Sequence, residues 1–340
     1  MRSSKGHLDV RRFALLVAGC ATLWAAAGFV CLFFGQAGLD ADTVLSALQG
    51  GQTGAAGDIV LFQRLPRVVL ALLTGGGLAV AGAVFQALLR NPLATPHTLG
   101  VSAGGAFAAI AAISFSATWP QIGPVGPLQF YGMIGAFINM GVIYLLATRR
   151  HHFSTFKLLL AGVTLALISS ALIMFVRYVS APHKLVVVDR WLMGGLDVQG
   201  YRSVAAILPL FGPALVLLLS RANALNLISF GEELAAGRGV NLKGLQTEIF
   251  VAGSVLTASV VSVAGPVGFV GLIVPHAFRI VLGPDHRRLL FASFFGGGAL
   301  LVIADTFART MFAPSELPVG VLTAMMGGPF FLVLLVRRGK

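Results

Sequence analysis

Ionisable residues inside apolar stretches are the first candidates for function in this sequence. Asp305 and Arg309 lie four residues apart in such a stretch, so on a helix they lie one turn apart, and we expect them to pair. Ionisable groups within a membrane are costly and are usually paired or functional. His276 follows Pro275, but no second histidine or carboxylate lies at ligand spacing, which favours a hydrogen-bonded structural histidine over a metal ligand.

Motifs of known enzymes are absent from the sequence. There is no Asp-rich phosphate motif, no His-Glu metal pair and no nucleophile elbow. We therefore expect a chain that catalyses no reaction itself and holds no cofactor or metal of its own.

The elements that must position these residues are membrane helices. Of the 340 residues, 57% are hydrophobic and 11% charged, and the mean hydropathy is +0.89, whereas soluble domains average about 25% charged residues. Stretches near the length of a membrane span predict an all-α integral membrane protein with about ten transmembrane helices. They lie near 13–35, 67–89, 98–115, 127–148, 155–179, 203–220, 246–264, 268–282, 289–312 and 318–336.

Basic residues mark one side of this predicted bundle. On the ten-span assignment, seventeen basic and five acidic residues fall on the side that holds both termini, and this balance equals the whole formal net charge of +12. Lysine and arginine collect in cytoplasmic loops, so both termini are predicted to be cytoplasmic. The basic charge then requires no nucleic-acid partner.

A short internal echo indicates that the chain has two related halves. Ala81-Gly82-x-Val84 is followed by Pro92, and Ala264-Gly265-x-Val267 is followed by Pro275 at the same spacing. About five spans separate the copies, and an odd number of crossings inverts the second copy. The echo predicts two inverted five-helix halves, with a chance match as the alternative.

The segment from Arg64 to Pro96 is rich in glycine and proline at membrane depth. Small residues let helices approach closely, and broken helices in a membrane are tolerated where the freed backbone faces protein or a water-filled cavity. The composition favours the lining of a pathway over a plain loop at the membrane surface.

The longest polar segment on the predicted inner side spans residues 221–245. Gly231, Ala235 and Gly239 lie four residues apart and would form one smooth helix face for another protein. Glu232 and Glu233 near the start of this helix match its dipole. An ordinary solvated loop is the alternative.

Several motifs together resemble the FecCD family of permeases. They are Arg64-Leu65-Pro66-Arg67, NPLATP with LGVSAG, WLMGGL, the Gly231-to-Gly239 loop, GFVGLIVPH with DHRR, and ELPVG, and they follow in the family's order from Arg64 onward. The resemblance implies a single permease domain over residues 1–340, in the bacterial inner (cytoplasmic) membrane.

The function that the resemblance implies is that of the transmembrane subunit of an ABC importer. It would move an iron chelate, a ferric siderophore or haem, from periplasm to cytoplasm, and a corrinoid such as vitamin B12 is the alternative cargo. The implied partners are a second copy of the chain, two cytoplasmic ATPase subunits that hold ATP and Mg, and a periplasmic substrate-binding protein. A stand-alone secondary transporter is a further alternative, motivated by the inverted echo and Asp305.

The resemblance also assigns roles to individual residues. Arg64, Arg67 and Arg309 would dock the binding protein at the outer face, where the charge assignment also places them. The inner gate would comprise Asn91, Leu93, Ser154, Thr155 and Phe156, and Phe156 departs from the small polar residue of the B12 permease. The coupling loop to the ATPase, residues 221–245, would act through Gly231, Glu232, Glu233, Ala235 and Gly239.

Overall fold

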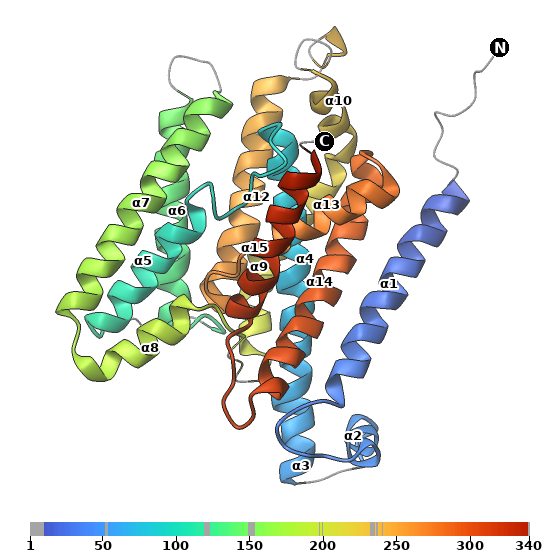
Figure 1. The fold of residues 1–340 in the computed structure, drawn as a ribbon, viewed down its shortest axis with the longest axis vertical. Coiled ribbons are helices and arrows are strands. Elements are labelled where there is room, and N and C mark those ends of the chain that lie inside the picture. Colours follow the sequence, from blue (N-terminus) through green and yellow to red (C-terminus); the bar gives the residue numbers. More distant parts are fainter. Residues whose placement is uncertain are drawn as a thin grey trace.

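The computed structural model of the chain is a bundle of helices (Figure 1). It describes residues 10–51, 54–118, 123–148, 154–196, 198, 200–231, 235, 237–239 and 241–338. The first half contains α1 (Val10–Leu32), α2 (Ala41–Leu48), α3 (Ala55–Asp58), the π-helix η1 (Ile59–Arg64), α4 (Leu65–Leu88), α5 (Val101–Ser114), α6 (Pro127–Ala147) and α7 (Thr155–Val179). The second contains α8 (Pro182–Leu192), α9 (Arg202–Ser220), α10 (Ala222–Phe230), α12 (Leu242–Ala264), α13 (Val270–Leu282), α14 (His286–Met311) and α15 (Val319–Arg338).

The apolar stretches predicted from the sequence all form helices. Within the described residues, seven segments are long and apolar enough to cross a membrane, namely Arg11–Leu32, Ala55–Leu88, Pro127–Ala147, Thr155–Val179, Arg202–Ser220, Leu242–Ala264 and His286–Met311. Three shorter apolar helices, Val101–Ser114, Val270–Leu282 and Val319–Leu332, coincide with the remaining predicted stretches. The chain is therefore a multi-pass membrane protein, and its second span begins earlier than predicted because η1 continues into α4.

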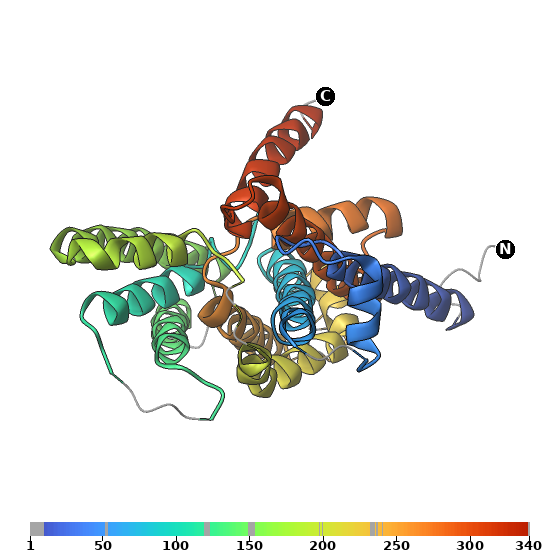
Figure 2. The same cartoon turned by 90° about the horizontal axis from the view of Figure 1, so that it is seen from below.

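Helix α4 lies at the centre of the main bundle, where it packs against α9, α12, α13 and α14 (Figure 2). Glycines make this close packing possible. A Cβ atom on Gly75 would lie 2.2 Å from the carbonyl oxygen of Gly297 in α14, and one on Gly82 would lie 2.0 Å from that of Gly271 in α13. Helices in lipid gain little from hydrophobic burial, so such close backbone contact is a main source of their association.

The same order of helix lengths occurs in two groups of four helices, which are separated by α8, α9 and α10. The order is long, short, long, long in α4 to α7 and again in α12 to α15, and each short helix follows a residue in the left-handed conformation, Gly100 or Phe269. Helices α4 and α12 pack together and run in opposite directions (Figure 1). The two inverted halves predicted from the sequence stay a prediction.

The sequence echo itself is wrong as an alignment of the two groups. Gly82 lies inside α4, where α13 contacts it, whereas Gly265 is the C-cap of α12 with φ 65°. Pro92 lies in a loop and Pro275 lies inside α13. Equivalent residues of a true repeat would occupy equivalent places in their helices.

The two ends of the bundle differ in charge. Helix α10, the start of α1 and the end of α15 lie at one end, and α2, α3 and α8 lie at the other (Figure 1). The first, called here the α10 end, also holds the basic helix termini at Arg11, Arg90, Arg221, Arg279 and Arg287. The second is called the α8 end.

Candidate functional site

A charge cluster joins α4 to α14 at the α8 end. Arg67 donates from Nε and Nη2 to the two carboxylate oxygens of Asp305, at 2.9 and 3.0 Å, and from Nη1 to Glu316 Oε2 at 3.0 Å. Asp305 is buried, with 2% of its surface exposed. Such a two-pronged contact between arginine and carboxylate is strong and geometrically specific.

The predicted pair of Asp305 and Arg309 is present but is the weaker of the two contacts. Arg309 Nε lies 3.8 Å from Asp305 Oδ2, beyond hydrogen-bond distance. Arg67 could not be chosen from the sequence as the main partner of Asp305, because the two residues are 238 positions apart.

Arg64 and Arg309 hold the end of α1. Arg64 donates to the carbonyl of Leu32 at 3.0 Å, and Arg309 Nη2 donates to the carbonyl of Cys31 at 3.0 Å. Carbonyls in the last turn of a helix lack partners within the helix, so the two guanidinium groups act as caps. Both arginines are buried, whereas the Arg67 side chain is 19% exposed. The docking role of all three arginines stays a prediction. Arg67 is the one whose side chain is most accessible to a partner.

A cavity of about 430 Å³ opens beside this cluster. Its lining comes from the starts of α6 and α9, the ends of α8 and α12, and the loop before α15, and it includes Arg67, Arg190, Trp191, Arg202 and Glu316. Arg190 and Arg202 are exposed. The charge assignment places both on the outer side, but no motif singled them out as functional.

The two predicted gate segments, after α4 and at the start of α7, both lie at the α10 end (Figure 1). The loop that contains Asn91 and Leu93 leads to Gly100, which packs against the backbone of Gly162 in α7. The Leu93 amide donates to Asn91 Oδ1 at 3.0 Å, which fixes a tight turn. Leu93 is 41% exposed.

The second gate segment is the first turn of α7. Ser154 caps the helix by accepting from the Lys157 amide at 3.3 Å, Thr155 is half-buried, and Phe156 is 73% exposed. A large exposed apolar side chain such as Phe156 is typical of a surface that meets lipid or another protein.

The structure describes part of the coupling segment. The Ala235 amide donates to the Gly231 carbonyl at 3.1 Å, the Arg238 amide donates to the Ala235 carbonyl at 3.2 Å, and Ala235 and Gly237 are helical. Gly231 has φ 131° and Gly239 has φ 77°, conformations that mark the two ends of a helical turn. Ala235 is fully buried. Ala235 therefore faces the protein in the single chain, and the predicted contact of this face with another protein stays a prediction.

Glu232 and Glu233 lie outside the described residues. The coupling role of the segment is not tested by these contacts and stays a prediction. Arg238 and Gly239 follow Ala235 in the coupling segment, and both are exposed.

A polar network connects α10, within the coupling segment, to the start of α14. Asp285 caps α14 by accepting from the Arg287 amide at 3.0 Å, and Asn226 in α10 donates to Asp285 Oδ1 at 2.7 Å. Burial raises the pKa of Asp285, but hydrogen bonds from Arg287 and Asn226 outweigh that effect, so the pKa lies below its ordinary value. The DHRR motif thus ties the start of α14 to α10, the helix at the beginning of the coupling segment.

His276 is buried in α13, with its ring edge-on to Phe330 at 6.4 Å between centroids. Over the part of the chain that the structure describes, no three His, Cys, Asp or Glu side chains come together as a metal-binding group.

These features define a multi-pass membrane protein with candidate contact sites at both ends. Comparison with known proteins identifies its class. Residues 23–337 match the FecCD transport family, and the chain belongs to that family.

Characterised relatives of the chain are permeases of import systems. It is 43% identical to the cobalamin import permease of Halobacterium salinarum over 86% of this chain and 77% of that one. It is 38% identical to the hemin transport permease of Yersinia pestis, over 81% and 82%, and 36% identical to the iron(3+)-hydroxamate import permease of Bacillus subtilis, over 84% and 86%. A solved metal-chelate type ABC transporter in an inward-facing conformation matches with a TM-score of 0.82 at 30% identity, over 95% of this chain and 99% of that one.

Proposed function

We propose that this chain is the permease subunit of an ABC importer that carries an iron chelate, a ferric siderophore or haem, from the periplasm to the cytoplasm. The observation that carries the proposal is the family match over residues 23–337. ATP hydrolysis takes place on a partner ATPase that holds ATP and Mg, and this chain supplies the path without catalysing a reaction.

The proposed topology has ten spans with both termini in the cytoplasm. The seven long helices and the three shorter apolar ones account for the ten crossings. On the charge assignment, seventeen basic and five acidic residues lie on the side of the α10 end, and the positive-inside rule assigns that end to the cytoplasm. The α8 end then faces the periplasm of a bacterial inner membrane.

Each end has a proposed partner. At the α8 end, a periplasmic binding protein would meet Arg67 together with the exposed Arg190 and Arg202, and opposite charges would orient it. At the α10 end, one of two ATPase subunits would contact the coupling segment. A second copy of the chain would complete the path, with Leu93 and Phe156 at its inner gate.

The proposed cargo is bulky and partly apolar. The exposed side chains of α7 are mostly apolar, among them Leu160, Leu167, Met174 and Phe175. A path for bare metal ions would be expected to present carboxylates or histidines near the membrane midplane. The named cargoes of the relatives are cobalamin, hemin and iron(3+)-hydroxamate, so a corrinoid is the alternative.

Uptake into liposomes tests the proposal. The chain is reconstituted with its ATPase and binding protein, and uptake of haem, a ferric hydroxamate and vitamin B12 is measured with and without ATP. ATP-dependent uptake of an iron chelate is expected, and uptake of vitamin B12 alone would select the corrinoid alternative. Uptake by this chain alone, driven by a proton gradient, would instead identify a secondary transporter and overturn the proposal.

A further inference from the structure

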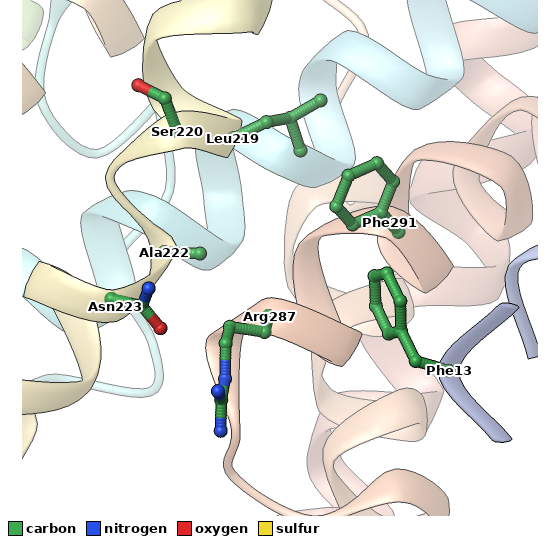
Figure 3. A pocket seen from close by; sticks show the side chains of 7 residues that line it. All are labelled: Phe13, Leu219, Ser220, Ala222, Asn223, Arg287 and Phe291. Carbon is green, nitrogen blue, oxygen red and sulfur yellow. The ribbon is translucent and has the colours of Figure 1, made fainter. Parts of the chain in front are cut away.

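A second pocket lies at the α10 end, away from the gate and from the cavity beside Arg67. It is about 200 Å³ in volume and lies where α1, the turn between α9 and α10, and α14 meet (Figure 3). Its lining residues are Phe13, Leu219, Ser220, Ala222, Asn223, Arg287 and Phe291. Ala222 and Asn223 lie within the predicted coupling segment, but no role was predicted for any of the seven residues individually.

The pocket lies at a shared boundary between apolar and polar sequence. Helix α1 becomes apolar at Phe13 after two arginines, α9 ends its apolar run at Leu219, and α14 begins with polar residues before Leu289. The three helices change character at one level, as helices do where hydrocarbon gives way to lipid headgroups.

The part of the pocket nearer the middle of the membrane is apolar. The rings of Phe13 and Phe291 pack edge to face, with centroids 5.6 Å apart. An exposed stripe continues from Ser220 down α9 through Val216, which is 66% exposed, to Pro213. Both α1 and α9 pack on α14, so the pocket between them continues into an apolar surface of the kind that an acyl chain covers.

The part of the pocket nearer the α10 end of the molecule is polar and cationic. Figure 3 shows the Arg287 side chain between Asn223 and Phe13. Asp285 accepts from Nε and Nη2 of Arg287, at 3.2 and 3.1 Å. Asp285 thus holds the guanidinium in place, and Nη1 has no hydrogen-bond acceptor among the described residues. An orientated arginine with a free donor group, above an apolar wall, suits a phosphate that carries a hydrocarbon chain.

We propose that this pocket binds an anionic phospholipid of the leaflet at the α10 end, with its phosphate at Arg287 and Asn223 and an acyl chain along Val216 and Pro213. The cations around it favour a lipid with net negative charge. Arg11 and Arg12 directly precede Phe13 and are exposed. Basic pockets between membrane helices at such an interface are known sites for acidic headgroups.

Native mass spectrometry of the full chain, released from detergent with added phosphatidylglycerol, tests this proposal. Arg287→Gln and Asn223→Glu should each lower the fraction of lipid-bound protein about fivefold. Arg288→Gln and Ser229→Glu are matched controls that make the same charge changes nearby, at residues that do not line the pocket, and they should leave binding unchanged.

The remaining outcomes decide the identity of the ligand. Phosphatidylcholine should bind more weakly than phosphatidylglycerol, and free inorganic phosphate should not displace the lipid. Equal loss in Arg287→Gln and Arg288→Gln would overturn the proposal in favour of general attraction to the basic surface. Equal binding of both lipids, or displacement by phosphate, would overturn the claim for an anionic phospholipid. Lipid binding is measured without uptake, so its failure leaves the proposed transport function standing.

Discussion

At the scale of single residues, the buried charges of the α8 end have a structural explanation. Asp305 neutralises Arg67 and lies close to Arg309, and Arg64 and Arg309 cap α1. Removal of one member of a buried ion pair leaves an uncompensated charge, which costs more than the pair contributes. The side chains for which a docking role is predicted are therefore also ones on which the folding of this end depends.

Asp305→Asn is expected to destabilise the protein because Arg67 and Arg309 would then lack their buried counter-charge. The free energy of unfolding should fall by about 3 to 5 kcal/mol, measured by denaturant titration in detergent micelles. Glu316→Gln is the control, because the Glu316 side chain is 33% exposed, and it should cost less than about 1 kcal/mol. Equal losses in the two variants would show that burial does not govern the energy of this cluster.

At the scale of helices, glycines decide which elements touch. Gly75 and Gly82 bring α14 and α13 against α4 at backbone contact distance. Glycines at the coupling segment have a different task, since Gly231 and Gly239 adopt backbone conformations at the ends of a turn.

Gly82→Ala tests the contact between α4 and α13. The added Cβ would meet the Gly271 carbonyl at 2.0 Å, so the helices must separate, and we expect a loss of about 1 to 3 kcal/mol in unfolding free energy. Gly19→Ala is the control in α1, where no atom lies within 4 Å of the added Cβ, and it should be neutral or stabilising. A thermal melt that is unchanged in Gly82→Ala would contradict the close packing.

The coupling segment is best tested at an exposed position. A change at Ala235 would disturb buried packing whether or not a partner binds there. Arg238→Glu reverses an exposed charge instead, and we expect several-fold lower uptake with the basal ATPase activity of the complex retained. Arg288→Glu serves as the control for charge at the same end, and normal uptake in Arg238→Glu would argue against coupling through this surface.

At the scale of the whole molecule, the single chain leaves apolar surface uncovered along α7, the helix that begins with one gate segment. Helix α7 lies at one edge of the bundle (Figure 1), and most of its side chains are exposed. Lipid covers such a surface in part, and the proposed second copy would cover the remainder near Phe156.

Phe156→Cys tests the paired arrangement in a background with Cys20→Ala and Cys31→Ala. We expect a short thiol-specific crosslinker to join two copies through this position, with a yield that changes when the assembled importer binds ATP. Leu15→Cys is similarly exposed, at 65% against 73% for Phe156, and should not crosslink. Crosslinking at Leu15 but not at Phe156 would place the contact between copies elsewhere.

The sequence by itself determined the class of the protein and the places of its helices. Hydropathy and charge are local properties, so apolar stretches and the basic side can be found without knowing any contact. The pairing of Asp305 with Arg309 could be predicted for the same reason, because one helical turn joins them. The family was recognisable from motifs spread along the chain.

Only the tertiary structure decided which distant residues meet. Arg67 became the main partner of Asp305, Asn226 joined Asp285, and Arg64 reached the end of α1 through contacts that depend on how whole helices pack. The inward side of Ala235 and the turn-ending conformations of Gly231 and Gly239 likewise depend on the surrounding fold. Spacing along a chain constrains neighbours within a helix, whereas burial and long-range pairing follow from the arrangement of all the helices together.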